Sequence, residues 1–332
     1  MNKAGASAAG WPERPLPFRE PFVVLGSALA DVRAVPRPSR GVCAAGTVTL
    51  CAGGCGRNIA EDLARLGRRT ALLAAVGEDA AGRFLLAETC RAGVDVSAVQ
   101  TFSGRATGCF AAVLGRGASL RQATAQTSIR QVLDEAFVRA RLPVLLERAG
   151  ALVVELALPQ RGLAAAVELA VAASVPVCLE VARSPGVRGT PPSLAGFELV
   201  KGSLPECRGL AAALGGPSSS AVEAAVTFLA AGARAALVTM GAAGALVASR
   251  EGVLRLSHPA VEALDTAGAG DAFLAGLLDA SARGAGWRQA MLRGAAAARL
   301  ALLSTLSCPE ELGPDVLDAP ERATITVEAL PA

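Results

Sequence analysis

Residues 265–271, Asp-Thr-Ala-Gly-Ala-Gly-Asp, have the types and spacing most suited to chemistry in this sequence. The glycines at 268 and 270 let a ligand approach the backbone closely, and the helix expected after them presents unpaired N–H groups to a phosphate. Asp271 then lies where a carboxylate can take a proton from a hydroxyl that attacks this phosphate. The segment predicts a phosphoryl-transfer site, and the alternative is a strand-to-helix turn without a ligand.

A second glycine turn, Gly-Gly-Cys-Gly-Arg-Asn-Ile-Ala, occupies residues 53–60. Gly53 and Gly54 can admit a sugar hydroxyl to the backbone, and Asn58 offers both a donor and an acceptor one helical turn later. A dinucleotide-binding fingerprint is disfavoured because Ile59 replaces its third glycine. Two alternatives remain, a helix start packed on a neighbouring element and a nicotinamide oxidoreductase.

Residue types that are rare or missing narrow the chemistry further. His258 is the only histidine, tyrosine is absent, and Lys3 and Lys201 are the only lysines. A histidine-dependent hydrolase would have to use His258, which precedes a proline in an expected loop. Neither lysine has the Gly-Lys-Ser/Thr context of a P-loop. Phosphate binding is therefore expected to rest on glycine amides, helix dipoles, arginine and metal ions.

Composition indicates a globular protein that is large and apolar enough to bury a core. The chain has 332 residues, of which 52% are hydrophobic, and its net charge is +3. The arginines are scattered, so a nucleic-acid partner is not expected. No apolar run is long enough for a membrane span, and the first residues lack the apolar core of a signal peptide. Eight widely spaced cysteines suit a reducing compartment, and we expect a cytoplasmic protein.

The elements that must position these residues alternate between strands and helices. Strands are expected at residues 22–25, 48–51, 71–76, 109–114, 151–156, 175–181, 198–200, 236–240, 245–248 and 261–264. Helices are expected at 59–66, at 80–92 and in most of the remaining gaps. This alternation predicts an α/β fold with a mainly parallel sheet covered on both faces. Strand-like runs without a helix, at about 33–51 and 99–125, predict a small lid sheet.

The two glycine motifs, in this order, resemble those of the ribokinase-like (PfkB) carbohydrate and nucleoside kinases. The resemblance covers about residues 22–304, and residues 53–67, with Gly26-Ser27-Ala28 and Asp31, look most like pseudouridine kinases. It implies a three-layer sandwich with a small β-sheet lid, a kinase domain over 22–310, a flexible leader over 1–21 and a C-terminal tail over 311–332. The implied reaction is ATP-dependent phosphorylation of a primary hydroxyl, C5′ in pseudouridine.

The resemblance also implies a role for each candidate site residue. Asp271 is the base, and the developing phosphate charge is held by the amides of Gly268, Ala269 and Gly270. The sugar hydroxyls are bound by Asp31, Gly53, Gly54 and Asn58. The nucleotide phosphates lie beside Ser203, Thr239, Gly241 and Gly244. Glu206 orders Mg²⁺, and Asp265 with the backbone of Ala267 forms a monovalent-cation site for K⁺.

Several positions depart from the family pattern on the substrate and metal side. Leu29, Ala157, Glu180 and Gly202-Ser203 stand where the family usually carries other residues, mostly asparagine, aspartate or proline. A kinase-fold protein that binds a nucleoside but transfers phosphate poorly is therefore an alternative, as is a kinase for ribose or adenosine. The expected partners are a small nucleoside or sugar, a second copy bound through the lid, and a linked pseudouridine-5′-phosphate glycosidase activity.

Overall fold

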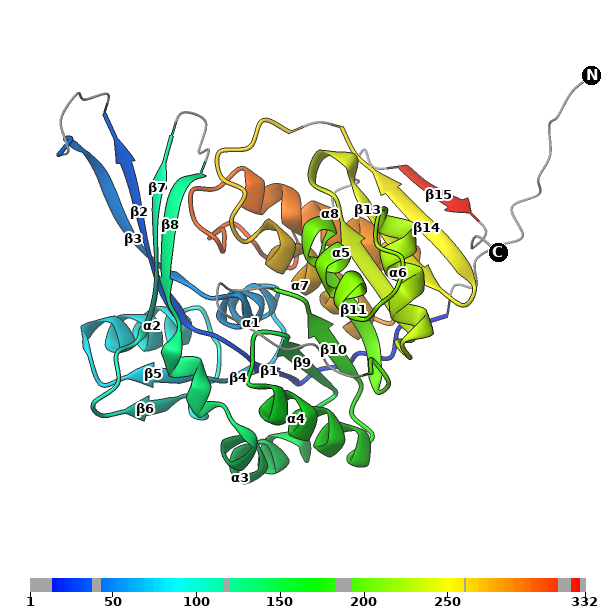
Figure 1. The fold of residues 1–332 in the computed structure, drawn as a ribbon, viewed down its shortest axis with the longest axis horizontal. Coiled ribbons are helices and arrows are strands. Elements are labelled where there is room, and N and C mark those ends of the chain that lie inside the picture. Colours follow the sequence, from blue (N-terminus) through cyan, green and yellow to red (C-terminus); the bar gives the residue numbers. More distant parts are fainter. Residues whose placement is uncertain are drawn as a thin grey trace, which may run out of the picture.

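A nine-stranded sheet forms the centre of the protein in a computed structural model that describes residues 14–37, 43–115, 120–182, 193–259, 261–315 and 324–328. Its strand order is β15-β14-β13-β12-β11-β10-β9-β1-β4 (Figure 1). Neighbours from β4 to β12 are parallel, and those from β12 to β15 are antiparallel. The strands are β1 (Phe22–Leu25), β4 (Thr70–Leu73), β9 (Ala151–Glu155), β10 (Val177–Glu180), β11 (Phe197–Ser203), β12 (Ala235–Thr239), β13 (Ala245–Ser249), β14 (Gly252–Ser257) and β15 (Thr324–Glu328).

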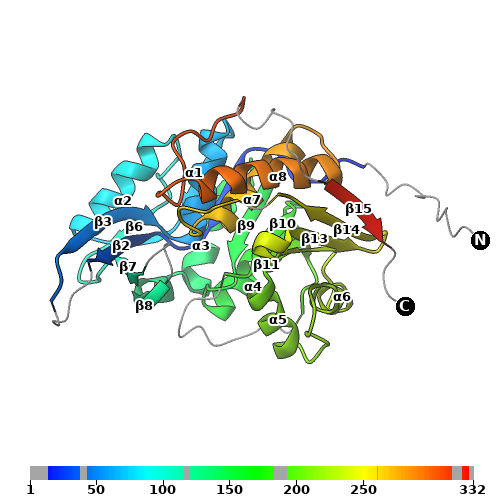
Figure 2. The same cartoon turned by 90° about the horizontal axis from the view of Figure 1, so that it is seen from above.

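Helices cover both faces of this sheet, which makes three layers (Figure 2). One face carries α1 (Cys55–Arg65), α2 (Ala80–Arg91), α7 (Ala269–Ala282) and α8 (Trp287–Leu302). The other carries α3 (Glu135–Leu146), α4 (Gln160–Ala172), α5 (Leu204–Ala213) and α6 (Ala221–Ala230). Successive strand residues point to opposite faces, so Val153 joins the first core and Val154 the second. Because both faces of the sheet are buried, its strands need apolar residues at successive positions.

A separate four-stranded sheet, the lid, projects from one end of the main body (Figure 1). Its order is β3-β2-β7-β8, from strands β2 (Leu29–Pro36), β3 (Gly46–Gly53), β7 (Gly108–Leu114) and β8 (Leu120–Gln126). β5 (Ala75–Gly77) and β6 (Gln100–Phe102) pair beside it, and two short 3₁₀ helices, η2 (Ser128–Val132) and η3 (Gly241–Ala243), complete the described elements. The predicted α/β fold with a small β-sheet lid is confirmed.

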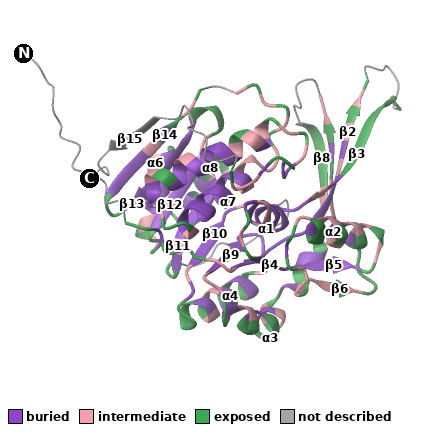
Figure 3. Cartoon of the chain, turned by 180° about the vertical axis from the view of Figure 1, so that it is seen from behind, coloured by how far each residue is buried: buried purple, intermediate pink, exposed green. Residues whose placement is uncertain are grey.

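The two faces of the lid differ in chemistry. Asp31 and Arg33 on β2 are buried and paired with each other, and Arg33 is also ion-paired with Asp265 of the main body. On the alternate face, Val48 and Leu50 of β3 and Val113 of β7 are exposed, and exposed residues extend along the outer lid strands in Figure 3. The lid thus carries its buried charged pair toward the body and exposed apolar side chains on its outer side.

The structure corrects three local predictions. Residues 71–76 are two strands, because the chain leaves the main sheet after β4 and β5 pairs with β6. Residues 261–264 are irregular, and the strand that precedes the glycine turn is instead β14. The leader expected over 1–21 is described from residue 14, and there Leu16 and Phe18 are buried in the first core, so this part is packed rather than flexible.

The parallel strands end at a common edge, and this edge positions the site. Glu180 ends β10, Ser203 ends β11 and Thr239 ends β12. The carboxyl ends of parallel strands are where open α/β sheets bind ligands. No described helix is long and apolar enough to span a membrane.

Candidate active site

The glycine turn before α7 has the geometry predicted for an anion-binding loop. Gly268 is the N-cap of α7, and its φ of 81° is in the left-handed region that favours glycine. A Cβ atom there would also clash with the carbonyl oxygen of Ser307. Ala269 and Gly270 are the first two residues of the helix, so their amides are unpaired by the helix itself, and Asp271 follows in its first turn.

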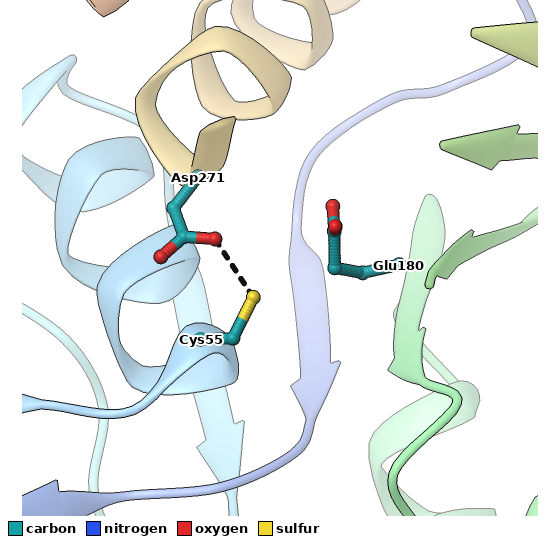
Figure 4. A group of neighbouring side chains, drawn as sticks. All are labelled: Cys55, Glu180 and Asp271. Carbon is teal, nitrogen blue, oxygen red and sulfur yellow. Dashed lines mark hydrogen bonds between the residues drawn. The ribbon is translucent and has the colours of Figure 1, made fainter. Parts of the chain in front are cut away.

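Asp271 is held between α7 and α1 by two hydrogen bonds. The side-chain amide of Asn58 donates to it over 2.9 Å, and the Cys55 thiol donates over 2.7 Å (Figure 4). Burial raises the pKa of Asp271, and the charge of Lys201 opposes this shift. The carboxylate is therefore fixed in one orientation and more basic than an exposed one, as a general base should be.

Two residues that sequence analysis did not select hold the start of α1. Arg57 donates to the side-chain oxygen of Asn58 over 2.9 Å, which turns the Asn58 NH₂ group toward Asp271. Glu155, at the end of β9, accepts from the backbone N–H and the hydroxyl of Ser27, both at 2.9 Å, and from the N–H of Gly56. The carboxylate thus joins the end of β1 to the positive end of α1.

The residues expected to bind the sugar lie together where the lid meets α1. Gly53 ends β3, and Gly54 is the N-cap of α1, four residues before Asn58. A Cβ atom on Gly53 would clash with the carboxylate of Asp31, so this glycine makes room for it. Burial raises the pKa of Asp31 to about 6, although Arg33 and Arg57 oppose the shift. Asp31 can accept hydrogen bonds from hydroxyl groups next to Asp271.

The residues expected to bind the nucleotide lie at or just after the carboxyl ends of β11 and β12. Ser203 of β11 and Thr239 of β12 are register partners, and the Thr239 hydroxyl donates to the carbonyl of Gly202 over 3.4 Å. Gly241 and Gly244 bracket the tight turn of η3, where the N–H of Gly244 donates to the carbonyl of Gly241.

Glu206 fits a magnesium ion that is held mainly by phosphates. It accepts from the N–H and hydroxyl of Ser203, at 2.9 and 2.5 Å, in a capping box that fixes its carboxylate at the start of α5. Burial is the main cause of the raised pKa of Asp271, and the charge of Glu206 adds to it, so Glu206 is within electrostatic range of the base. Mg²⁺ is commonly bound by one or two carboxylates, phosphates and waters.

Asp265 and Ala267 do not fit the expected K⁺ site. One oxygen of Asp265 accepts from the Ala267 N–H over 2.9 Å, and the other is paired with the guanidinium of Arg33 from the lid. Arg33 also donates to the Thr305 carbonyl over 3.1 Å and to the Ser307 hydroxyl over 2.6 Å. A cation at this carboxylate would meet the positive charge of Arg33, so no step of the reaction is assigned to K⁺.

Lys201 was set aside by sequence analysis because it lacks a P-loop context, yet it lies in the site. Its Nζ is 2.7 Å from a carboxylate oxygen of Glu180, and the two side chains are only 3% and 2% exposed. Burial alone would lower the pKa of Lys201, but the charges of Glu180 and Asp271 raise it, so the ammonium is retained. Glu180 and Lys201 are register partners on neighbouring parallel strands, and no local sequence pattern encodes such a pairing.

A glycine turn at a helix start (residues 265–271, the phosphate loop), a partly buried carboxylate at its end and a small lid sheet on an α/β body are features expected of a phosphotransferase. Residues 20–311 match the model of the pfkB family carbohydrate kinases. The chain belongs to this family, and it is a carbohydrate kinase that transfers phosphate to an alcohol group.

Individual relatives agree on the family and differ in substrate. Ribokinase of Haemophilus influenzae is 28% identical over 290 residues, 86% of this chain and 93% of that protein. Pseudouridine kinase of Escherichia coli is 27% identical over 258 residues, 77% and 82% of the two chains. An uncharacterized sugar kinase of Escherichia coli is 41% identical over 100 residues, which span only 28% of its length. The predicted family is confirmed, but special closeness to pseudouridine kinase is not established.

A solved structure supports the fold. Ribokinase of Arabidopsis thaliana, complexed with ribose and ATP, superposes with a TM-score of 0.73 at 24% identity and covers 90% of this chain and 97% of its own. The likeness includes the main sheet and the lid region, since nearly the whole of both chains is covered.

Proposed function

We propose that this protein transfers the γ-phosphoryl group of MgATP to the C5′ hydroxyl of a nucleoside, and that pseudouridine is the first acceptor to test. One observation carries the proposal: Asp271 is held by Asn58 and Cys55 at the start of α7, between the sugar-binding residues and the strand edge. A hydroxyl bound by Asp31 and the Gly53-Gly54 turn would lie next to this base.

In this mechanism, Asp271 removes the proton of the attacking hydroxyl. The amides of Gly268, Ala269 and Gly270 and the dipole of α7 stabilise the charge that develops on the phosphoryl oxygens. Mg²⁺, when bound, neutralises phosphate charge, and Glu206 is the residue that would hold it. Ser203, Thr239, Gly241 and Gly244 would border the ATP phosphates.

An aromatic ring on the inner face of the lid favours a nucleoside over a free sugar. Phe110 of β7 is the register partner of Asp31, so both side chains lie on the same face of the lid. Phe110 is only half-buried, which leaves part of its ring available to a ligand. A base attached to a sugar held by Asp31 could stack on this ring, whereas ribose has no aromatic group to stack.

A nucleoside and sugar panel with MgATP tests the substrate. We expect Phe110→Ala to raise KM for pseudouridine about tenfold, because base–aromatic stacking contributes about 1–3 kcal/mol. Its effect on KM for any free sugar that is accepted should be small. Phosphorylation is followed by ADP release, with Phe102→Ala as a control, since Phe102 lies on β6 outside the lid.

Ribose is the second candidate, because ribokinase of Haemophilus influenzae matches this chain over a larger share than the pseudouridine kinase does. A higher kcat/KM for ribose than for every nucleoside would replace the pseudouridine assignment. Should pseudouridine be the acceptor, we propose that a linked glycosidase consumes its 5′-phosphate by cleaving the carbon–carbon glycosidic bond.

We also propose that two copies pair through the outer face of the lid. Val48 is 70% exposed and Leu50 is 52% exposed, and Val113 continues the same apolar face on β7. Contiguous exposed apolar surface commonly marks a protein–protein contact. The polar inner face would remain turned toward the acceptor.

We expect Val48→Glu to convert a dimer to a monomer, because it would bury a carboxylate in an apolar contact. The mass in solution is measured by light scattering. Val144→Glu is the matched control, since Val144 is 65% exposed on α3, away from the lid. A wild-type protein that is monomeric at all concentrations would rule out pairing through the lid.

A further inference from the structure

Lys201 is the feature of the site that the mechanism above leaves without a role. It is the only lysine of the chain apart from Lys3, which lies outside the described residues. It is buried at the carboxyl end of β11, and burying an ammonium group is costly unless it is paired. Its presence in the site therefore calls for a function beyond packing.

The Lys201 ammonium lies directly beside the phosphate loop. A Cβ atom built on Gly270 would be 3.0 Å from Nζ, and among the described residues Lys201 alone would lie within 4 Å of it beyond its chain neighbours and its own helix. The space next to the Gly270 amide is thus bordered by a positive charge. The ammonium therefore lies next to a residue whose amide is proposed to hold the phosphate.

We propose that Lys201 is a catalytic residue whose ammonium binds the phosphoryl group during its transfer from ATP to the acceptor, and that Glu180 holds this ammonium in position. The proposal rests on the proposed kinase function and adds a fourth group to the three loop amides. The Lys201 Nζ to Glu180 distance of 2.7 Å, in register between neighbouring strands, fixes where the charge lies.

The surrounding charges also suit this role. Cys55, Glu180 and Asp271 bring one ligand atom each to within 4.8 Å of one another, as the view in Figure 4 illustrates. Such a group could hold a metal ion, but the Lys201 ammonium already pairs with Glu180 and supplies the positive charge. A fixed ammonium in a water-poor site stabilises developing negative charge without reorganisation.

The step balances as an ordinary phosphoryl transfer. A bond forms between the acceptor oxygen and the γ-phosphorus while the bond from this phosphorus to the β–γ bridging oxygen breaks, and ADP leaves with that electron pair. The hydroxyl proton passes to Asp271. Lys201 keeps its proton throughout and contacts the non-bridging oxygens of the moving group.

The test compares Lys201→Met with Lys201→Arg and with the double variant Lys201→Met/Glu180→Gln. We expect Lys201→Met to lower kcat about 10²- to 10³-fold with little change in KM for the acceptor, the loss typical of one electrostatic stabiliser of a transition state. Lys201→Arg, which keeps the charge, should retain part of the activity. The double variant removes both charges, so it leaves no unpaired carboxylate, and it should stay as slow as Lys201→Met.

Nucleotide affinity, measured by calorimetry without an acceptor, gives a second readout that does not depend on turnover. Wild type should bind ATP more tightly than ADP, and Lys201→Met should lose most of this preference because only ATP carries the γ-phosphate. An equal ATP-to-ADP preference in wild type and Lys201→Met would overturn the proposal, as would recovery of kcat in the double variant. Failure of the kinase function itself would appear separately, as a wild type that binds ATP but phosphorylates nothing in the panel.

Discussion

Asp271→Asn is expected to lower kcat by at least about 10²-fold while ATP binding is largely kept, because loss of a general base typically costs 10²- to 10⁴-fold. Asparagine has nearly the same shape as aspartate and can still accept from the Asn58 amide, which donates over 2.9 Å in the wild type. The variant therefore removes the base and retains the packing between α1 and α7. Unchanged turnover would mean that Asp271 is not the base.

The pH dependence gives the same residue a second test. Burial raises the pKa of Asp271 and Lys201 opposes this, so the net shift is upward. A base must be ionised to act. As the pH is lowered, kcat should therefore begin to fall at a pH above the pKa of an exposed aspartate. Asp95→Asn is the control. Asp95 is exposed and far in sequence from Asp271, so this variant should leave the dependence of kcat on pH unchanged.

Gly270→Val is expected to lower kcat by a similar factor, at least about 10²-fold, since it would obstruct the volume where the loop amides meet the phosphate. Gly270 has no positive φ, and within the described part of the chain a Cβ atom there would meet only the end of the Lys201 side chain. The fold should therefore tolerate valine, and the damage should appear in turnover and ATP affinity rather than in Tm.

Gly268→Ala is the informative contrast to Gly270→Val. At Gly268 the backbone is left-handed, and an added Cβ atom would clash with the Ser307 carbonyl, which cannot swing away as a side chain can. We expect a lower Tm, from backbone strain of about 1–3 kcal/mol. Normal kinetics in Gly270→Val would contradict a phosphate position next to this amide.

The parts of the site that could be predicted from the sequence are those in which neighbouring residues determine the local structure. The turn at residues 265–271 was predicted to begin a helix and does so, because glycine spacing and helical periodicity are properties of neighbouring residues. Asn58 and Asp271 were selected separately, and the structure brings them within hydrogen-bonding distance. Both belong to motifs that can be recognised without knowing the tertiary fold.

Residues whose roles depend on tertiary packing could not be found in this way. Arg57 acts by orienting Asn58, Glu155 by joining β1 to α1, and Lys201 by pairing across two strands. Arg57 and Asn58 are neighbours within α1, but the other two contacts join elements whose alignment is set by sheet register, which no local pattern encodes. The expected strand at 261–264 was wrong for the same reason, since apolar residues without a strand to pair with remain irregular.

Arg33 couples the position of the lid to the conformation of the phosphate loop. It belongs to β2, yet its guanidinium contacts Asp265, the Thr305 carbonyl and the Ser307 hydroxyl, and Ser307 lies against Gly268. Any displacement of β2 must rearrange these contacts. An acceptor that stabilises the lid and a nucleotide that stabilises the loop would then favour the same arrangement of Arg33, and each would strengthen the binding of the other by an identical factor.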